Sequence, residues 1–476
     1  MMKGARFSCC LAVSLCSWAC GQVDNGENAD GGANVTTLTA GNADSNDDNA
    51  GGTSDSNGGS AGGDAEVGGQ DSNPPGETGN ASNGDEESGG APPVTFDVGM
   101  MPDGGGEGFC MPGMGGGGMG GKKEPEFSFL WACNSTQGTI SKIDTQTVTE
   151  VGRYYTRPDL SGSPSRTSVS LSGHVAVANR SGGITKFYAT VEDCVESNGT
   201  PGIQTSTDNN PLPWDQEECR AWHLPFDYDS QRPVAWAPGE WNQSLCEYEN
   251  ELLWSAGRWG QVDTEVVLID GEAGVVLDQV NIPGLKADQF GLYGAAVDSE
   301  GNLWTSGWAT GNHLVRVDID TMAVDVWDGP SSTGLTSHWY GMTVDVNGFV
   351  WNCASRVARF DPTTENWTVS DDLGNFAAGC MADGDPDGLL WLGTSGVLRG
   401  IDRDTFAIVH DWPVPSNYGV SVDFFGNVWA VNGNGAHRVD PDTGTVTSYN
   451  GLVGAYTYSD MTGFALNTVG GGGPSR

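Results

Sequence analysis

A repeated motif of the form Asp-x-x-Gly-x-x-Trp constrains the fold of this chain more than any other feature of its sequence. Four copies follow one another, and each ends at a tryptophan: Trp304, Trp351, Trp391 and Trp429. Successive tryptophans are 47, 40 and 38 residues apart, a period typical of four-stranded propeller blades. The repeat therefore predicts small antiparallel sheets packed radially around a common axis.

Each copy of the motif carries the signals of a β-hairpin. In one copy, the alternating run Tyr340–Asp345 leads through a turn into the tryptophan-bearing run Gly348–Cys353. Aspartate at the first turn position and glycine at the fourth suit a type I turn. A second turn signal, an aspartate that ends a short β-branched run, recurs at Asp144, Asp270, Asp318, Asp361, Asp402 and Asp440. We interpret these repeated residues as packing and turn chemistry.

Weaker copies extend the series to seven. Trp131 and Trp254 occupy the tryptophan position of two further copies, and Ala176 replaces it in a third. The first blade, which starts near Phe127, lacks its innermost strand, whereas residues 458–466 form an alternating run without a hairpin partner. We therefore predict an all-β, seven-bladed β-propeller over residues 123–470, closed by a strand within 458–466, with residues 471–476 as a tail.

The charge of the chain excludes two classes of partner. The formal net charge is −41, and residues 20–120 contain 17 acidic residues and no Lys or Arg. Such a chain repels the phosphates of nucleic acids and the headgroups of anionic lipids. We expect no nucleic-acid partner, and contact with a membrane only through a lipid anchor.

Residues 1–20 resemble a bacterial lipoprotein signal peptide. A basic start precedes the apolar run Phe7–Ala19, which is too short to span a bilayer. The following residues, Cys20 and Gly21, complete a sequence similar to a lipobox. The resemblance implies export and lipidation of Cys20, and Gln22 implies sorting to the outer membrane, facing the periplasm or the cell surface. Cys16 and ordinary signal cleavage remain alternatives.

Residues 21–122 are rich in Gly, Asn, Asp and Ser and have almost no large apolar residues, so we expect a disordered acidic tether. Six sulfur-bearing residues crowd into one part of it: Met100, Met101, Cys110, Met111, Met114 and Met119. Thioether and thiolate ligands favour Cu(I), so a copper site is one interpretation. The other interpretation is a glycine-rich linker whose methionines have no role.

The cysteine spacing predicts disulfides, as expected of a chain exported to an oxidising compartment. A long insertion at about residues 190–250, between the second and third blades, contains three cysteines. Two more lie on neighbouring blades near the same rim. We predict the pairs Cys353–Cys380, Cys194–Cys219 and Cys110–Cys133, with Cys246 left unpaired.

The blade motif resembles that of the streptogramin lyase family of seven-bladed propellers, and more distantly that of NHL-type propellers. The likeness covers about residues 127–467. It implies a site with a histidine base, a glutamate partner and Mg²⁺ in the central cavity. Here the histidine position holds Tyr293, Tyr340, Cys380, Tyr418 or Ser165, and the glutamate position holds Gly307, Ala354, Thr394, Asn432 or Asn179. Because no blade has either residue, the resemblance supports the fold and not the catalysis.

We therefore expect a monomeric binding module that needs no cofactor and takes a protein, peptide or carbohydrate ligand through its central funnel or rim. The candidate funnel-lining residues are Tyr293, Tyr340, Tyr418, His338, Arg166, Arg180, Trp308, Asn432 and Asp460. An equally weighted interpretation is that the tyrosines only pack the channel wall.

The alternative function is that of a diverged lyase or lactonase. It would need a Ca²⁺ or Mg²⁺ ion at the channel mouth, held by carboxylates such as that of Asp460, and a base such as His338. A third hypothesis is a spacer domain that has no ligand.

Overall fold

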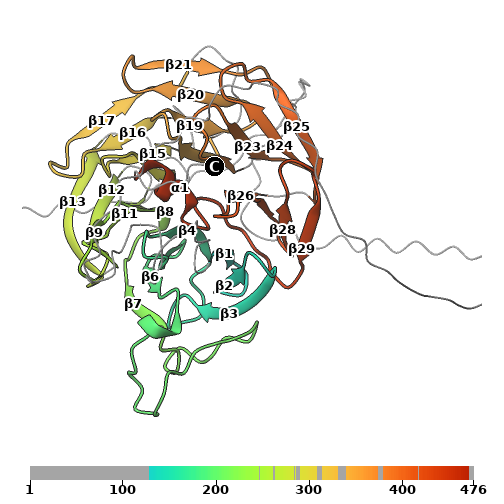
Figure 1. Cartoon of the computed structure of the whole chain (residues 1–476). Coiled ribbons are helices and arrows are strands. Elements are labelled where there is room, and N and C mark those ends of the chain that lie inside the picture. The colour runs from blue at the N-terminus through green and yellow to red at the C-terminus, as the bar shows by residue number, and fades with distance from the viewer. Residues whose placement is uncertain are drawn as a thin grey trace, which may run out of the picture. The chain divides into compact units, whose positions relative to one another are not determined.

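The computed structural model describes residues 128–470, except for residue 246 and the segments 261–262, 284, 286–289, 308–312, 331–338, 374–378 and 416–417. Several predictions therefore concern residues outside this part of the chain: the signal peptide, the tether and the tail, and with them Cys20, Cys110, Cys246, His338, Trp308 and the sulfur-rich segment. The described residues form seven antiparallel sheets arranged as the blades of a propeller (Figure 1). The predicted fold class is confirmed.

The blades follow one another along the chain, and the strands of each blade pair antiparallel. The first blade has three strands, β1 (Phe129–Asn134), β2 (Thr139–Asp144) and β3 (Thr149–Tyr155). The second comprises β4 (Pro164–Val169), β5 (Val175–Asn179), β6 (Ile184–Phe187) and β7 (Arg220–Leu224), with a 3-10 turn η1 (Val191–Asp193) between the last two. The third comprises β8 (Ser230–Trp236), β11 (Leu252–Trp259), β12 (Asp263–Asp270) and β13 (Val275–Pro283), and a separate hairpin, β9 (Glu240–Asn242) and β10 (Glu247–Glu249), follows β8.

The remaining four blades are more uniform. The fourth comprises β14 (Leu292–Val297), β15 (Leu303–Gly307), β16 (Leu314–Val317) and β17 (Val324–Trp327). The fifth comprises β18 (Gly341–Val344), β19 (Val350–Cys353), β20 (Val357–Asp361) and β21 (Asn366–Val369). The sixth comprises β22 (Cys380–Ala382), β23 (Leu389–Gly393), β24 (Val397–Asp402) and β25 (Ile408–Pro413). The seventh comprises β26 (Gly419–Val422), β27 (Val428–Val431), β28 (Ala436–Val439) and β29 (Val446–Tyr449).

The first strand of each of blades two to seven lies nearest the axis, because β4, β8, β14, β18, β22 and β26 contact one another in turn. Strands β4, β8, β18 and β26 are buried along their whole length, whereas the outer strands β13 and β25 are mostly exposed. Each blade therefore buries its inner strands against its neighbours and leaves its outer edge in water.

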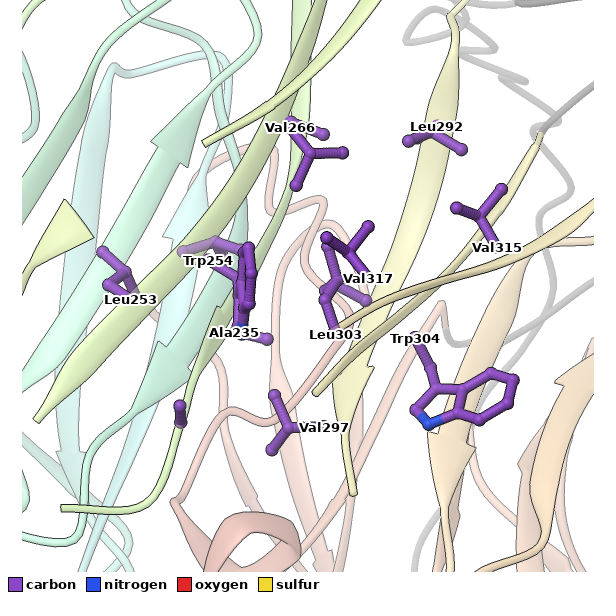
Figure 2. Packing of buried hydrophobic residues seen from close by; sticks show 14 of the residues in the cluster. Ala235, Leu253, Trp254, Val266, Leu292, Val297, Leu303, Trp304, Val315 and Val317 are labelled. Atoms are coloured by element: carbon purple, nitrogen blue, oxygen red, sulfur yellow. The ribbon is translucent and has the colours of Figure 1, made fainter. Parts of the chain in front are cut away.

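The repeated tryptophans lie in the second strands and pack between blades. In blades four, five and seven the indole Nε1 donates to the aspartate that begins the same turn: Trp304 to Asp298 (2.9 Å), Trp351 to Asp345 (2.8 Å) and Trp429 to Asp423 (2.8 Å). Trp254 of the third blade packs with Leu303 and Val317 of the fourth in the core between these two blades (Figure 2). Trp304 instead faces the fifth blade, where its ring centre lies 6.0 Å from that of Phe360. The motif thus encodes packing together with one hydrogen bond, in agreement with the sequence interpretation.

The last hairpin of the blade is also present where the second turn signal predicts it. In six blades the aspartate side chain accepts the N–H groups of residues two and three positions later, at Asp144, Asp270, Asp318, Asp361, Asp402 and Asp440. The residue four positions after the aspartate has a positive φ, and in four of these turns it is not glycine: Val148, Met322, Glu365 and Phe406. The aspartate, rather than glycine, is the constant element of this turn.

The C-terminal segment closes the ring against β1, as predicted. The backbone N–H of Tyr456 donates to the carbonyl of Cys133 (3.1 Å), and that of Trp131 donates to the carbonyl of Met461 (2.9 Å). Asn134 and Ala455 form an isolated antiparallel bridge. The segment therefore takes the place of the missing innermost strand of the first blade.

The predicted strand through residue 466 is wrong, because the chain turns into helix α1 (Phe464–Val469). Gly463 at the helix N-cap has φ +85°, which interrupts the extended conformation. The Asp460 carboxylate accepts the N–H groups of Thr462 (3.2 Å), Gly463 (2.8 Å) and Leu466 (3.2 Å). The bond to Leu466 satisfies one free donor in the first turn of the helix, and the other two hold the turn that leads into it, so the local sequence favours a helix here.

The stretch 190–250 is not one loop between two blades, as the sequence suggested, but two insertions within blades. The first lies between β6 and β7 of the second blade, and the second is the hairpin of β9 and β10 in the third. The outermost strand of one blade and the innermost strand of the next lie between these two insertions.

Two of the three predicted disulfides are present. Cys194 pairs with Cys219 and closes the first insertion, and Cys353 pairs with Cys380 and joins β19 to β22. Cys133 is instead a free and fully buried cysteine, so its predicted pairing is wrong. Burial raises the pKa of its thiol to about 12.

Candidate functional site

Five tyrosines meet where the inner strands begin, and we call them the tyrosine cluster. Tyr293 lies in β14, Tyr340 and Tyr418 directly precede β18 and β26, and Tyr456 and Tyr458 belong to the C-terminal segment. The Tyr456 hydroxyl is at the centre of the cluster, because it contacts the hydroxyls of Tyr293 (2.8 Å), Tyr458 (3.2 Å) and Tyr340. The Tyr418 and Tyr456 ring centres are 5.5 Å apart.

Three arginines, Arg166, Arg180 and Arg232, lie against the rings of the tyrosine cluster. The guanidinium carbon of Arg166 is 3.0 Å from the ring centre of Tyr458 and 4.4 Å from that of Tyr293. Arg232 lies 5.1 Å from the ring centre of Tyr293. A guanidinium over an aromatic face is attracted by the negative charge of that face. The centre of the channel is therefore a stack of aromatic rings and positive charge.

The arginine charges change the acidity of the cluster. Burial raises the pKa of Tyr293, but the positive charges of Arg166 and Arg232 and the hydrogen bond with Tyr456 lower it. The second effect is the larger, so the pKa of Tyr293 lies below its usual value. Burial raises the pKa of Tyr340 and Tyr458. Of these three hydroxyls, that of Tyr293 loses its proton most readily.

Several predicted funnel residues serve the interior or the loops of the protein. Tyr293 and Tyr340 are 1% and 6% exposed, so they pack the channel wall. The Asn432 side chain accepts the N–H groups of Asn434 (3.0 Å) and Gly435 (2.8 Å), which holds a turn. Asp460, proposed from the sequence as a metal ligand, instead accepts the N–H groups of Thr462 and Gly463 just before α1 and that of Leu466 within it.

The part of the cluster that solvent reaches is formed by Tyr418, Tyr456 and Arg180. Tyr418 is 43% exposed, and the other two residues are half-buried. The guanidinium carbon of Arg180 lies 4.3 Å from the ring centre of Tyr456. We call these three residues the channel mouth. They offer an aromatic surface, hydroxyl donors and a positive charge.

Helix α1 lies at the centre of the ring (Figure 1). Leu466 and Val469 pack in one buried cluster with Val234 of β8 and Met342 of β18. A cavity of about 30 Å³ remains between the helix and five of the inner strands, which is room for about one water molecule. The interior of the channel is therefore filled by the chain itself.

No group of three or more His, Cys, Asp and Glu side chains among the described residues is placed to hold a metal ion. The position that the sequence comparison gave to a histidine base holds buried Tyr293 and Tyr340, exposed Tyr418 and buried Ser165. In the sixth blade it holds Cys380, which forms a disulfide. The channel mouth is suited to hold an anionic group against an aromatic surface.

Sequence reasoning missed Tyr456, Tyr458 and Arg232. The two tyrosines alternate along an extended run, and alternate residues of such a run face the same side, which could have placed both in the channel. Arg232 is the third residue of its inner strand, as Arg166 is of β4. This equivalence is visible only once the blade boundaries are known.

The described part of the chain is thus a seven-bladed β-propeller whose central channel is filled by its own C-terminal segment. No protein-family model and no curated protein matches the chain. No helix in residues 128–470, gaps excepted, is long and apolar enough to cross a membrane.

Solved structures match the chain at low identity. A protein of unknown function from Bacteroides caccae is 11% identical, with a TM-score of 0.39, covering 61% of this chain and 94% of that one. The extracellular domain of a putative one-component system from B. thetaiotaomicron is 12% identical, with a TM-score of 0.39, covering 62% and 35%. The WD40 repeats of RRP9 are 11% identical, with a TM-score of 0.46, covering 64% and 87%.

Proposed function

We propose that this protein is an exported, lipid-anchored interaction module that binds its partner at the channel mouth. Export and anchoring rest on residues 1–20 and on Cys20. In this proposal residues 21–122 serve as a tether whose mean reach is on the order of 50–60 Å. The module acts as a monomer on the periplasmic or outer side of the outer membrane.

One observation favours the channel mouth over the interior of the channel as the binding site. The channel is occupied by Tyr456, Tyr458 and α1, which pack between the inner strands. A ligand inside the channel would displace these groups and break the backbone hydrogen bonds to β1. Binding at the channel mouth requires no such displacement, so it costs less reorganisation.

The charges at the channel mouth favour a peptide partner that carries a carboxylate. Arg180 donates to the Ser163 hydroxyl (3.3 Å), and its Nε has no hydrogen-bond partner among the described residues. In the same part of the chain, no carboxylate forms an ion pair with Arg180 or Arg166. An arginine without an acidic neighbour, in a chain of net charge −41, is available to pair with an acid of a partner.

Calorimetric titration with a library of capped acidic hexapeptides tests this site. The matched library has Asn and Gln in place of Asp and Glu. We expect binding by members of the acidic library alone, weakened roughly tenfold or more by Arg180→Gln. Arg438→Gln is the control, because Arg438 donates to the carbonyls of Thr145 and Gln146 away from the channel. The site is refuted if neither library binds, or if both arginine variants lose equal affinity.

The anchor has its own test. Cys20→Ser should abolish incorporation of radiolabelled palmitate and move the protein from the membrane fraction to the soluble fraction. Cys16→Ser serves as the control and should change neither readout. Labelling that survives Cys20→Ser would contradict the proposed lipidation.

A further inference from the structure

A groove on the outer edge of the second blade is separate from the channel mouth. It has a volume of about 570 Å³ and is formed by the first insertion together with β7 and the end of β6. Its walls include Tyr188, Ser197, Trp214, Arg220, Trp222 and His223. We call it the insertion groove. Its volume falls in the range of about 300–1,000 Å³ that is typical of small-molecule sites.

The walls of the insertion groove are fixed without a ligand. The Cys194–Cys219 disulfide joins the two ends of the insertion, with Cα atoms 4.6 Å apart. The Glu218 carboxylate accepts the N–H groups of Ser197 (2.7 Å), Asn198 (2.9 Å) and Gln204 (2.8 Å). A ligand therefore meets a preformed groove and does not have to order a loop, which favours binding.

The aromatic rings of the groove are held in place by polar contacts. The guanidinium carbon of Arg220 lies 3.9 Å from the ring centre of Trp214, and Arg220 also donates to the Trp214 carbonyl. The His223 ring meets Trp214 edge-on, with centres 5.5 Å apart. Trp222 donates its indole N–H to the carbonyl of Gly271 (3.0 Å). The rings are thus fixed and partly exposed, as an aromatic binding platform requires.

His223 is a neutral ring in the groove. The Thr185 hydroxyl donates its one hydrogen to the carbonyl of Thr156 (2.6 Å), so in its contact with Nδ1 of His223 (2.9 Å) Thr185 accepts. Burial, with the charges of Arg157 and Arg220, lowers the pKa of His223 to about 4, so it is uncharged at neutral pH.

The chemistry of the groove selects among classes of ligand. Residues 190–219 contain seven acidic residues and no Lys or Arg, which disfavours anions. Arg220 in the wall disfavours cations, and a purely apolar ligand would desolvate Arg220 and His223 without replacing their hydrogen bonds. A neutral ligand that has both apolar faces and many hydroxyl groups satisfies all of these surroundings.

We propose that the insertion groove binds a neutral oligosaccharide. Pyranose faces lie against Trp214 and Trp222, and sugar hydroxyls bond to Arg220 and His223. Both donors and acceptors are present for this, because Arg220 only donates and the hydroxyls of Tyr188 and Ser197 do either. The proposal rests on no part of the proposed function of the channel mouth.

Saturation-transfer NMR and tryptophan fluorescence on the full chain test the proposal. The neutral probes are cellotetraose, N-acetylchitotetraose and maltotetraose, and tetragalacturonate is the acidic counterpart. We expect at least one neutral probe to bind and tetragalacturonate to bind more weakly. Trp214→Ala should weaken binding roughly tenfold or more. Trp259→Ala is the matched control, because Trp259 is 37% exposed in the neighbouring blade and outside the groove, and it should leave binding unchanged.

Two further variants keep the test decisive. Circular dichroism verifies that the Trp214→Ala variant is folded. If that variant is unfolded, the test uses Arg220→Met in its place, because methionine has a side chain of similar length. Arg180→Gln should not change saccharide binding, which separates this site from the channel mouth. The proposal is overturned if no neutral probe binds at millimolar concentration, if tetragalacturonate binds as well, or if both tryptophan variants behave alike.

Discussion

Blades four, five and seven hold their tryptophans within their own turns, whereas blades one to three depend on their neighbours. In the first group the indole N–H bonds the aspartate of the same hairpin. In the third blade, Trp254 instead donates to the carbonyl of Gly301 in the fourth (2.9 Å). In the first blade, the Nε1 of Trp131 has no hydrogen-bond partner among the described residues.

The second blade depends on its neighbour even more, because alanine stands at the position of its tryptophan. There Trp236 of the third blade donates its indole N–H to the carbonyl of Ser168 (3.1 Å). Contacts from remote parts of the chain also support the first blade, as when Arg153 donates to the carbonyl of Gly451 (2.7 Å). The comparison teaches that the clear motif of blades four, five and seven marks blades stabilised within their own turns, whereas the degraded motif of blades one to three marks blades stabilised by their neighbours. The sixth blade has the clear motif, but no bond between Trp391 and an aspartate of its turn is found among the described residues.

The largest effect should follow from removing the support of the first blade. A chain that ends at residue 454 loses the buried side chains Tyr458, Met461, Leu466 and Val469. At about 1.5–3 kcal/mol for each large apolar side chain, the loss is on the order of the whole stability of a domain. We expect thermal unfolding to move far down or to lose cooperativity. A chain that ends at residue 470 is the control. Equal melting temperatures for the two truncated chains would contradict the idea that the C-terminal segment stabilises the first blade.

A pair of tryptophan substitutions should separate the two groups of blades directly. Trp351→Phe removes the donor to the buried Asp345 carboxylate, so we expect a loss of about 2–3 kcal/mol. Trp131→Phe removes a buried donor without a partner, so its cost should be below about 1 kcal/mol. Urea unfolding measures both. Equal losses would mean that the Asp–Trp bond contributes nothing.

Acid should weaken the second blade through His174. Its Nδ1 accepts the N–H of Ala189 (3.2 Å), and burial, with the charge of Lys186, lowers its pKa to about 3. The unfolded chain binds this proton near pH 6.5, so stability is lost as the pH falls from 6.5 towards 3. We expect about 1–2 kcal/mol of loss between pH 7 and pH 5. His174→Gln should lack this part of the pH dependence, and parallel curves for the two proteins would contradict the assignment.

The smallest effects should come from a turn that both groups of blades share. Glu365 has φ 55° and is exposed, so Glu365→Gly should relieve strain and stabilise the protein by about 0.5–1 kcal/mol. Val148 has φ 56° in the equivalent turn, but its side chain is buried against the first and seventh blades. Val148→Gly should therefore destabilise. A gain in both variants, measured by urea unfolding, would show that the packing of Val148 is unimportant.

Local signals made most of the fold predictable. The aspartate turns and the tryptophan-bearing strands are each encoded by residues that lie close together in the sequence. A single sequence is therefore enough to recognise these hairpins. Two disulfides were predictable because the blade period places Cys353 and Cys380 on neighbouring blades, and Cys194 and Cys219 within one insertion. The position of the C-terminal segment was predictable because the first blade lacks a strand.

The insertions, helix α1 and the filled channel could not be predicted, because they depend on contacts that the spacing of residues in the sequence does not reveal. The motif has no copy around β7, so a short strand inside the insertion went unrecognised and the insertion was misplaced. Helix α1 has only six residues, and its signal, Asp460 before Gly463, was overridden by the alternation of the tyrosines. The sequence left open whether the tyrosines line a funnel or pack the channel wall, because nothing in the spacing of Tyr293 and Tyr340 shows that Tyr456 and Tyr458 cover them.

Closure of the ring by such a distant segment has a kinetic consequence. Val453 bonds to Asn134 across 319 residues of sequence, so this contact forms only after a slow search by the chain. Until that encounter, the inner edge of β1 exposes unpaired backbone groups to any other molecule with a similar edge. Refolding yield should therefore fall steeply with protein concentration, and the first blade is the place where aggregation would begin.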